Sequence, residues 1–270
     1  MHQLLEAALN GGRAPADHPA MPVSPTQLSA AAAEAVRAGA GAVHFHVRGG
    51  DGRESLAAVD VARAVAEVRT QGVPFGISTG AWIISDPVQR LAVVAEWTVL
   101  PDFVSINFDE EGAVELASFF LGRNVTLEAG VANSFAAEQL VRSGLANQCL
   151  RIMFEPREQV VADAMAAVAA TEAILDAAAV RAPRLLHGVN ATAWPLVDAA
   201  GARGYATRIG FEDTLTLPGG EMALGNGELV RAALARLAGV ATAAKYNREP
   251  GDTIDAQRRG PERAPEGRDR

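Results

Sequence analysis

Short apolar runs alternate with longer, alanine-rich segments along most of this 270-residue chain. Such an alternation predicts strands that are each followed by a helix, which is typical of parallel α/β folds. The predicted strands are Gln3–Leu9, Gly41–Val47, Pro74–Ser78, Phe103–Asn107, Val125–Glu128, Cys149–Phe154, Arg184–His187 and Tyr205–Ile209. The predicted helices are Pro25–Ala38, Ala57–Thr70, Pro87–Ala95, Ala113–Leu121, Ser134–Ser143, Gln159–Ala178, Ala193–Ala200 and Gly227–Leu237. This succession of strands and helices predicts a (β/α)8 TIM barrel.

Residues that begin and end helices support this reading. Ser24 before Pro25 is typical of a helix start, because a serine side chain caps free N–H groups and proline fits the first turn. Gly201 is available for the left-handed conformation that ends many helices. A doubly wound open sheet shares the alternation, but no G-x-G-x-x-G turn follows an early strand. The barrel is therefore the favoured architecture.

The composition fits one folded domain. With 49% hydrophobic residues, the chain can bury a large core. We expect residues 1–244 to form a single catalytic barrel and the polar segment 245–270 to form a disordered tail. The single cysteine, Cys149, has apolar neighbours and is predicted to be a buried strand residue, not a nucleophile.

Charge and hydropathy exclude several classes of function. The formal net charge of −8 argues against nucleic acid or an anionic membrane as the main partner, because an acidic surface repels both. The first residues lack a basic segment followed by a long apolar one, and no apolar stretch is long enough to span a membrane. We therefore expect a cytoplasmic protein that acts on small molecules.

The second predicted strand leads into His44-Phe45-His46-Val47-Arg48. Alternate residues of a strand face the same side, so both imidazoles are presented together. Neutral imidazole is the commonest metal ligand, and a catalytic zinc ion usually takes three protein ligands. By itself the pair is equally consistent with packing or hydrogen bonding. Of the other histidines, His18 and His187 lie in or beside loops and are weaker candidates as metal ligands.

Polar side chains follow each predicted strand, at the end of a barrel where active sites lie. They include Arg13, Ser78, Thr79, Ser105, Asn107, Glu128, Glu155, His187, Asn190, Arg208, Glu212 and Asp213. The eighth strand differs from the others, because Arg208, Glu212 and Asp213 place three charges around one glycine. We expect these charges to face the two histidines across the barrel mouth.

Three segments together carry a resemblance to a known family. They are the HFHVR segment, Asn10-Gly11-Gly12-Arg13 followed by Pro22-Val23-Ser24-Pro25, and the R-x-G-x-E-D pattern of residues 208–213. Over roughly residues 1–240 the chain resembles the β-keto acid cleavage enzymes, the family of 3-keto-5-aminohexanoate cleavage enzyme. The resemblance implies a zinc-dependent TIM barrel, usually a homotetramer. The implied activity is that of an acyltransferase, which converts a β-keto acid and acetyl-CoA into acetoacetate and a new acyl-CoA.

The resemblance also implies roles for individual residues. The metal ligands would be His44, His46 and Glu212, with zinc or another divalent ion between them. The catalytic residues would be Arg208, Asp213 and Glu128. Asp213 would position or perform a proton transfer, and Arg208 would offset the negative charge of an enolate. The substrate-binding residues would be Arg13, Ser78, Thr79, Ser105 and Asn107.

Two departures from the family pattern concern the loops. Gly49 follows Arg48, where the family pattern leads us to expect an acidic residue. Relatives that take an amine-bearing substrate place an acidic group near the position of Arg13. An arginine there would repel an ammonium group, so we expect a neutral or anionic β-keto acid as the substrate.

Two other functions are compatible with the same pattern. A zinc-dependent hydrolase on a TIM barrel would use the open metal position to activate water. Amidohydrolase-like barrels typically add further histidines, however, and this chain has only five. A non-catalytic barrel that binds metal is the second alternative, and it gives no reason for Arg208 and Asp213 beside the ligands.

Overall fold

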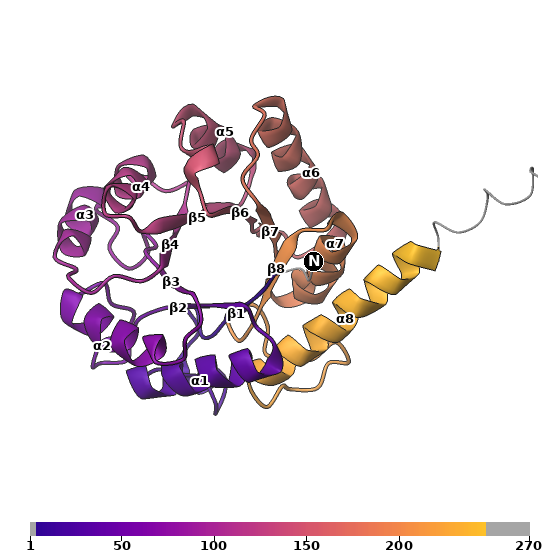
Figure 1. Ribbon diagram of the computed structural model, residues 1–270, viewed down its shortest axis with the longest axis horizontal. Coiled ribbons are helices and arrows are strands. Elements are labelled where there is room, and N and C mark those ends of the chain that lie inside the picture. Colours follow the sequence, from indigo (N-terminus) through magenta and orange to yellow (C-terminus); the bar gives the residue numbers. More distant parts are fainter. Residues whose placement is uncertain (1–3, 247–270) are drawn as a thin grey trace, which may run out of the picture.

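The computed structural model describes residues 4–246, and its strands close into a parallel barrel in chain order from β1 to β8 (Figure 1). Neighbouring strands pair in parallel, and β8 returns to pair with β1. The strands are β1 (Leu5–Ala8), β2 (Ala42–Phe45), β3 (Phe75–Ser78), β4 (Phe103–Asn107), β5 (Thr126–Val131), β6 (Arg151–Phe154), β7 (Arg184–Leu186) and β8 (Ala206–Ile209). The predicted (β/α)8 TIM barrel is confirmed.

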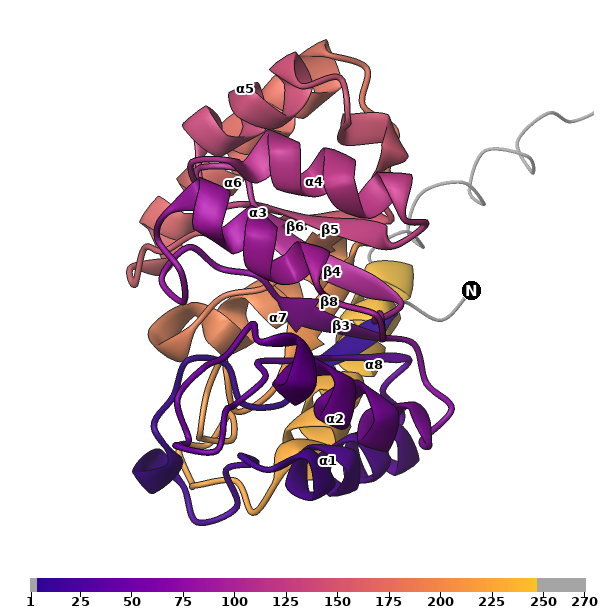
Figure 2. The ribbon, with the colours of Figure 1, turned by 90° about the vertical axis from the view of Figure 1, so that its left-hand side faces the viewer.

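The helices lie outside the ring of strands, as the views along and across the barrel show (Figures 1 and 2). They are α1 (Pro25–Ala38), α2 (Ala58–Arg69), α3 (Pro87–Ala95), α4 (Ala113–Gly122), α5 (Ser134–Arg142), α6 (Val161–Ala177), α7 (Ala193–Arg203) and α8 (Asn226–Tyr246). Short 3-10 turns occur at Pro15–Asp17, Ala146–Gln148 and Asn190–Thr192. Within the described part of the chain, every helix is too short or too polar to cross a lipid bilayer.

Most predicted elements lie where the sequence places them, and the exceptions have physical reasons. The Ser24 side chain accepts from the Gln27 N–H and caps α1 as expected. The prediction that Gly201 ends a helix is wrong, because α7 continues to Arg203 and the left-handed Gly204 ends it. A Cβ atom at Gly201 would lie only 3.0 Å from the Leu237 side chain, so this glycine permits close packing of α7 on α8.

Strand β5 is longer than predicted. The sequence suggests an end at Glu128, but the strand continues through Ala129 and Gly130 to Val131. Glu128 therefore lies inside the barrel, below its mouth, and is fully buried. Its carboxyl group is accommodated by Arg151 on the neighbouring β6 strand.

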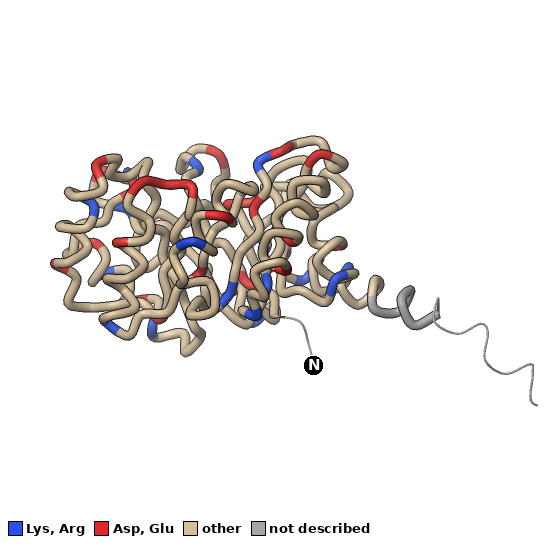
Figure 3. The backbone as a smooth tube through the Cα atoms, turned by 90° about the horizontal axis from the view of Figure 1, so that it is seen from above, with Lys and Arg blue, Asp and Glu red and all other residues tan. Residues whose placement is uncertain are grey.

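The mouth of the barrel lies at the carboxyl ends of the strands. In the side view of the backbone, acidic positions gather along the end opposite the N-terminus (Figure 3). Cys149 is buried as predicted, although it lies just before β6 and not within it. Helix α8 reaches Tyr246, two residues beyond the predicted domain end at 244. The rest of the predicted tail, residues 247–270, lies outside the described residues.

Candidate active site

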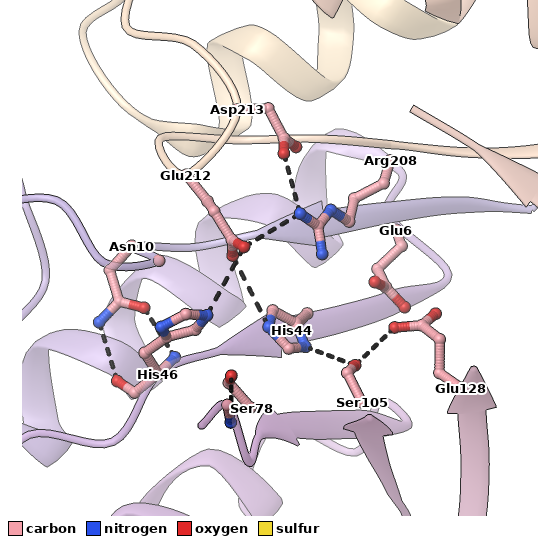
Figure 4. A network of polar contacts seen from close by, with 12 residues as sticks. Glu6, Asn10, His44, His46, Ser78, Ser105, Glu128, Arg208, Glu212 and Asp213 are labelled. Atoms are coloured by element: carbon pink, nitrogen blue, oxygen red, sulfur yellow. Dashed lines mark hydrogen bonds and ion pairs between the residues drawn. The ribbon is translucent and has the colours of Figure 1, made fainter. Parts of the chain in front are cut away.

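The three predicted metal ligands lie together at the barrel mouth (Figure 4). His44 and His46 come from the end of β2 and the residue beyond it, and Glu212 follows β8. The ligand atoms of the three lie within 4.8 Å of one another. His44 Nε2 is 3.6 Å from Glu212 Oε2, and His46 Nε2 is 3.5 Å from Glu212 Oε1. Two imidazole nitrogens and a carboxylate therefore surround one common point.

The loop after β1 holds this arrangement in place. The Asn10 side chain accepts from the His46 N–H at 2.9 Å and donates to the His46 carbonyl at 3.0 Å. Gly11 has a φ of 56°, and a Cβ atom there would lie 2.2 Å from Cγ of Glu212. Only glycine leaves room for Glu212 to pass over the loop in this conformation. Asn10 thus fixes the backbone of His46, and Gly11 leaves room for the Glu212 side chain.

The donor set fits a divalent metal ion. Glu212 Oε2 is buried and has no hydrogen-bond partner among the described residues. Burial lowers the pKa of His44 to about 4 despite the nearby Glu212, so this imidazole is neutral near pH 7. Glu212 is also buried, but Arg208 and the histidines hold its pKa well below the usual range. A neutral imidazole and an ionised carboxylate are the forms that bind metal, and two histidines with one glutamate suit zinc.

A carboxylate and an indole lie behind His46. His46 Nδ1 is in close contact with Glu54 Oε1, and Trp82 Nε1 donates to both Glu54 oxygens at 3.1 Å. The Trp82 and His46 rings stack with their centroids 5.9 Å apart. Burial disfavours the His46 imidazolium, but Glu212 and Glu54 outweigh it and raise the pKa of His46 to about 9.

A hydroxyl group and a buried ion pair lie behind His44. Ser105 Oγ is 3.2 Å from His44 Nδ1 and donates to Glu128 Oε2 at 2.7 Å. Arg151 donates to the other Glu128 oxygen at 2.5 Å and forms an ion pair with Glu6. The predicted catalytic residue Glu128 therefore contacts Ser105 and Arg151 and lies below the histidines (Figure 4).

The two carboxyl groups of this buried layer differ in charge. Burial raises the pKa of Glu6 to about 8, because the neighbouring Arg151 offsets only part of the desolvation. Glu128 is equally buried, but Arg151 and the other cations around it outweigh the desolvation and lower its pKa to about 2. Glu128 is therefore the carboxyl group that the cations hold ionised, and Glu6 is the one that burial shifts toward its protonated form.

Arg208 joins the metal-ligand group to a second buried cluster. Its Nη2 atom is 3.0 Å from Glu212 Oε1 and 3.0 Å from Asp213 Oδ1. Asp213 Oδ1 is also 3.2 Å from Nδ1 of the buried His187, and His187 Nε2 is 3.7 Å from Glu155. Burial and Arg208 disfavour a charged His187, but Asp213 and Glu155 raise its pKa to about 9. The expected crowding of Arg208, Glu212 and Asp213 opposite the histidines is present.

The predicted substrate-binding residues divide into two groups. Ser78, Ser105 and Asn107 line the same cavity as the two histidines, Arg208 and Glu212. Thr79 is buried and donates to the Ser105 carbonyl at 2.8 Å, so it supports the end of β4 and lines no part of that cavity.

Arg13 lies apart from this cavity, in the loop after β1. It donates to Asn190 Oδ1 at 2.7 Å and to the Phe211 carbonyl at 2.5 Å. A second cavity of about 370 Å³ adjoins the first and shares with it Trp82, Asn107, Glu155, Arg208 and Glu212. Its other lining residues are Pro156, Arg157, His187 and Val189. The two cavities therefore share the charged residues Glu155, Arg208 and Glu212.

A family model described as beta-keto acid cleavage enzyme matches residues 3–251. The chain belongs to the β-keto acid cleavage enzyme family. The match includes the residues that suggested this resemblance, from Asn10 to Asp213. No curated protein matches this family member closely enough to count as a relative.

Several solved structures share the fold of this β-keto acid cleavage enzyme family member. The ternary complex of ObcA with a C4-CoA adduct and oxalate has a TM-score of 0.65 at 18% identity, covering 85% of this chain and 67% of that one. The binary complex of ObcA with oxaloacetate has a TM-score of 0.64 at 19% identity, with coverage of 85% and 67%. The 3-dehydroquinate dehydratase from Geobacillus kaustophilus HTA426 has a TM-score of 0.55 at 11% identity, with coverage of 88% and 92%. This chain thus spans about two thirds of the length of ObcA.

Four residues of the site in this family member were not predicted from the sequence. They are Glu6, Glu54, Trp82 and Arg151. A signal for Glu54 exists, because the glycine-rich turn after Arg48 brings the chain back beside β2. Glu6 and Arg151 each interrupt an apolar strand, which is typical of a buried ion pair.

Proposed function

We propose that this protein is a metal-dependent β-keto acid cleavage enzyme, an acyltransferase that makes acetoacetate and an acyl-CoA from a β-keto acid and acetyl-CoA. The observation that carries the proposal is the convergence of His44, His46 and Glu212 on one buried point. Arg208 and Asp213 lie directly beside it, in a chain of this family. A zinc or other divalent ion held by the three ligands would act as a Lewis acid toward a carbonyl group.

The first chemical step is removal of a proton from the carbon between the keto and carboxylate groups. We assign this proton transfer to Asp213, whose Oδ2 atom is buried and lacks a hydrogen-bond partner among the described residues. Its other oxygen is held by Arg208 and contacts His187, so the carboxylate has a fixed orientation. Arg208 would offset the negative charge that moves onto the substrate.

The later steps need no nucleophile from the protein. The enolate carbon attacks the acetyl thioester, and CoA leaves as a thiolate. The thiolate then attacks the original ketone, and cleavage of the carbon–carbon bond releases the new acyl-CoA and the enolate of acetoacetate. This enolate takes back the proton held by Asp213 and becomes acetoacetate. Burial raises the pKa of the Cys149 thiol to about 12, which agrees with the absence of a role for it.

The remaining predicted residues receive roles from their contacts. Ser78 and Asn107 line the cavity and would orient the β-keto acid. Ser105 also lines the cavity and links His44 to Glu128. We therefore propose that Glu128 influences the reaction indirectly, through Ser105 and His44. Thr79 would act by holding Ser105 in place.

Charge near the cavities supports a neutral or anionic β-keto acid as the substrate. Arg157 and His187 line the second cavity, and Arg13 lies at the neighbouring loop. The acidic lining residues, Glu155 and Glu212, are paired with His187 and Arg208. A cationic side chain on the substrate would meet these basic groups unfavourably. We also propose the homotetramer typical of the family, since large apolar side chains such as Val88 and Leu224 are 77% and 82% exposed in the single chain.

The experiment that tests this function is a turnover assay on zinc-loaded protein with a panel of β-keto acids. Each acid is incubated with and without acetyl-CoA, and acetoacetate and acyl-CoA are measured separately. We expect turnover only when acetyl-CoA is present. Consumption of a keto acid without acetyl-CoA would indicate a hydrolase or a decarboxylase. Binding of acetyl-CoA and keto acids without any product would indicate a non-catalytic barrel.

A further inference from the structure

A short hairpin places one acidic residue behind His46. The chain turns back after β2, so that Arg48 and Glu54 form an antiparallel bridge. Gly49 N–H donates to the Arg53 carbonyl at 2.8 Å, and Ser55 N–H donates to the Val47 carbonyl at 3.0 Å. This return brings the Glu54 carboxylate to His46 Nδ1, although eight positions separate the two residues in the sequence.

The contact determines which nitrogen of His46 faces the metal ligands. A carboxylate can only accept a hydrogen bond, so His46 Nδ1 must carry the proton in this pair. Nε2 is then the atom that faces the other two ligands, 3.5 Å from Glu212, and a metal ion would bind there in place of the Nε2 proton. Imidazoles that bind metal commonly donate their other N–H to a carboxylate, which fixes the ring and makes the ligand more basic.

Trp82 holds Glu54 from the other side. Its indole N–H lies 3.1 Å from each Glu54 oxygen, and its ring stacks on His46 with an interplanar angle of 24°. The ring also covers Gly80, where a Cβ atom would lie 2.2 Å from the indole. Trp82 comes from the loop after β3, so two loops meet at this carboxylate.

The second histidine has a different partner. His44 Nδ1 faces the hydroxyl group of Ser105, and this hydroxyl group donates in turn to Glu128. Glu54 is therefore the acidic group that contacts a histidine ligand directly on the side away from the common point.

We propose that Glu54, held by Trp82, is the positioning residue that orients His46 for metal binding, an inference that rests on the metal-dependent function proposed above. Glu54 does not line the cavity that contains the histidines, and it acts through the His46 ring. Its removal should weaken metal binding first and turnover as a consequence.

The test is the dissociation constant for zinc, measured by competition between the metal-free protein and a chromophoric chelator at fixed pH. Glu54→Ala should weaken zinc binding by roughly 10- to 100-fold, the range typical of such outer carboxylates. Glu54→Gln retains an acceptor oxygen and should show a smaller loss. Asp51→Asn is the matched control, because Asp51 lies in the same hairpin with a side chain 64% exposed to solvent, and it should bind zinc like the wild type.

Trp82→Phe tests the second half of the proposal. It keeps an aromatic ring over His46 but removes the indole N–H, so zinc affinity should fall by about 2- to 10-fold, as expected for one lost hydrogen bond. Zinc should also change the tryptophan fluorescence of the wild type and not that of Trp82→Phe, because Trp82 stacks on His46. Trp97 and Trp194 are buried and donate their indole N–H groups to the Leu56 and Thr216 carbonyls.

Wild-type zinc affinity in Glu54→Ala, with unaltered thermal unfolding of the metal-free form, would overturn the proposal. If Glu54→Ala does not fold, wild-type affinity in Glu54→Gln and Trp82→Phe would overturn it equally. The readout is independent of turnover. The wild-type protein could therefore cleave no β-keto acid while the variants bind zinc more weakly than it does. That result would support the positioning role and refute the proposed reaction.

Discussion

Replacing Arg151 with methionine should destabilise the protein at pH 5 and more strongly still at pH 8. Arg151 is the cation between Glu6 and Glu128 inside the barrel, and both carboxyl groups are fully buried. Methionine keeps much of the aliphatic stem, so the change removes mainly the guanidinium group, with its charge and its contact with the Phe103 ring. Removal of one partner from a buried ion pair typically costs about 3–5 kcal/mol.

The pKa values of the two carboxyl groups give a similar magnitude and set the pH range. The pKa of Glu128 is lowered from 4.5 to about 2, which corresponds to roughly 3 kcal/mol of stabilisation at neutral pH. A lowered pKa stabilises the fold above the unfolded value near 4.5 and loses this effect as the pH falls toward 2. Without Arg151 that contribution is lost, and burial without a cation raises the pKa of both carboxyl groups, so the cost grows further as the pH rises above 4.5.

Chemical unfolding at pH 5 and pH 8, followed by circular dichroism, measures the difference. Glu6→Gln should behave oppositely to Arg151→Met. Because the pKa of Glu6 is raised to about 8, ionisation of Glu6 destabilises the fold as the pH rises from 4.5 through 8, and glutamine removes this penalty. Arg184→Met on the neighbouring β7 strand is a control, since its partner Asp176 is exposed. An equal loss for Arg151→Met at both pH values would mean that packing, and not charge, explains the effect.

Three further predictions concern the site and the single cysteine. Asp213→Asn should lower kcat by about 10²- to 10⁴-fold, as expected for loss of a proton-transfer group, while zinc affinity changes by only a few fold. Steady-state kinetics with a parallel zinc titration tests this prediction. Glu138→Gln, on the exposed face of α5, is the control and should leave both kcat and zinc affinity unchanged. Arg13→Glu should shift the preference of the enzyme from anionic or neutral β-keto acids toward an amine-bearing one; an unaltered ranking of kcat/KM across the panel would exclude Arg13 as a specificity determinant. Because burial raises the pKa of Cys149 to about 12, the thiol should resist a disulfide reagent at pH 8 in the native protein and react after unfolding; rapid labelling of native protein would contradict this.

The fold could be predicted because each unit carries its own local signal. Each strand is a short, mostly buried run, and most helices have an alanine-rich pattern with recognisable ends. Element ends were harder to predict, as Gly201 and Glu128 illustrate. A glycine in a helix can serve close packing, and a carboxylate in a strand can be buried beside an arginine that lies far away in the sequence. Neither outcome can be predicted from the few residues on either side of the position.

The candidate site could be predicted where its residues are close in sequence. His44 and His46 share a strand, and Arg208, Glu212 and Asp213 share one turn, so the barrel topology was enough to bring the groups together. The outer partners were missed for a different reason. Arg151 reaches Glu6 across 145 positions, and Trp82 reaches Glu54 across 28. Such pairs depend on how side chains of different strands and loops meet in space. The spacing of apolar residues along the sequence does not specify this.

The charges inside the barrel explain why one of two histidine and carboxylate clusters is the better metal site. The lower cluster, Glu6, His44 and Glu128, has ligand atoms as close together as the upper one. Its charge is already balanced, because Arg151 neutralises Glu128 and burial shifts Glu6 toward its protonated form.

The upper cluster has an excess of negative charge. Glu212, Asp213 and the nearby Glu54 are three carboxylates that face Arg208 and His187, the histidine in contact with Asp213. One Glu212 oxygen also has no hydrogen-bond partner among the described residues. A buried group of this kind requires a compensating cation, which a divalent ion supplies and a proton on His46 supplies only in part. We infer that the lower layer is the rigid floor that orients His44 through Ser105, and that the metal belongs above it.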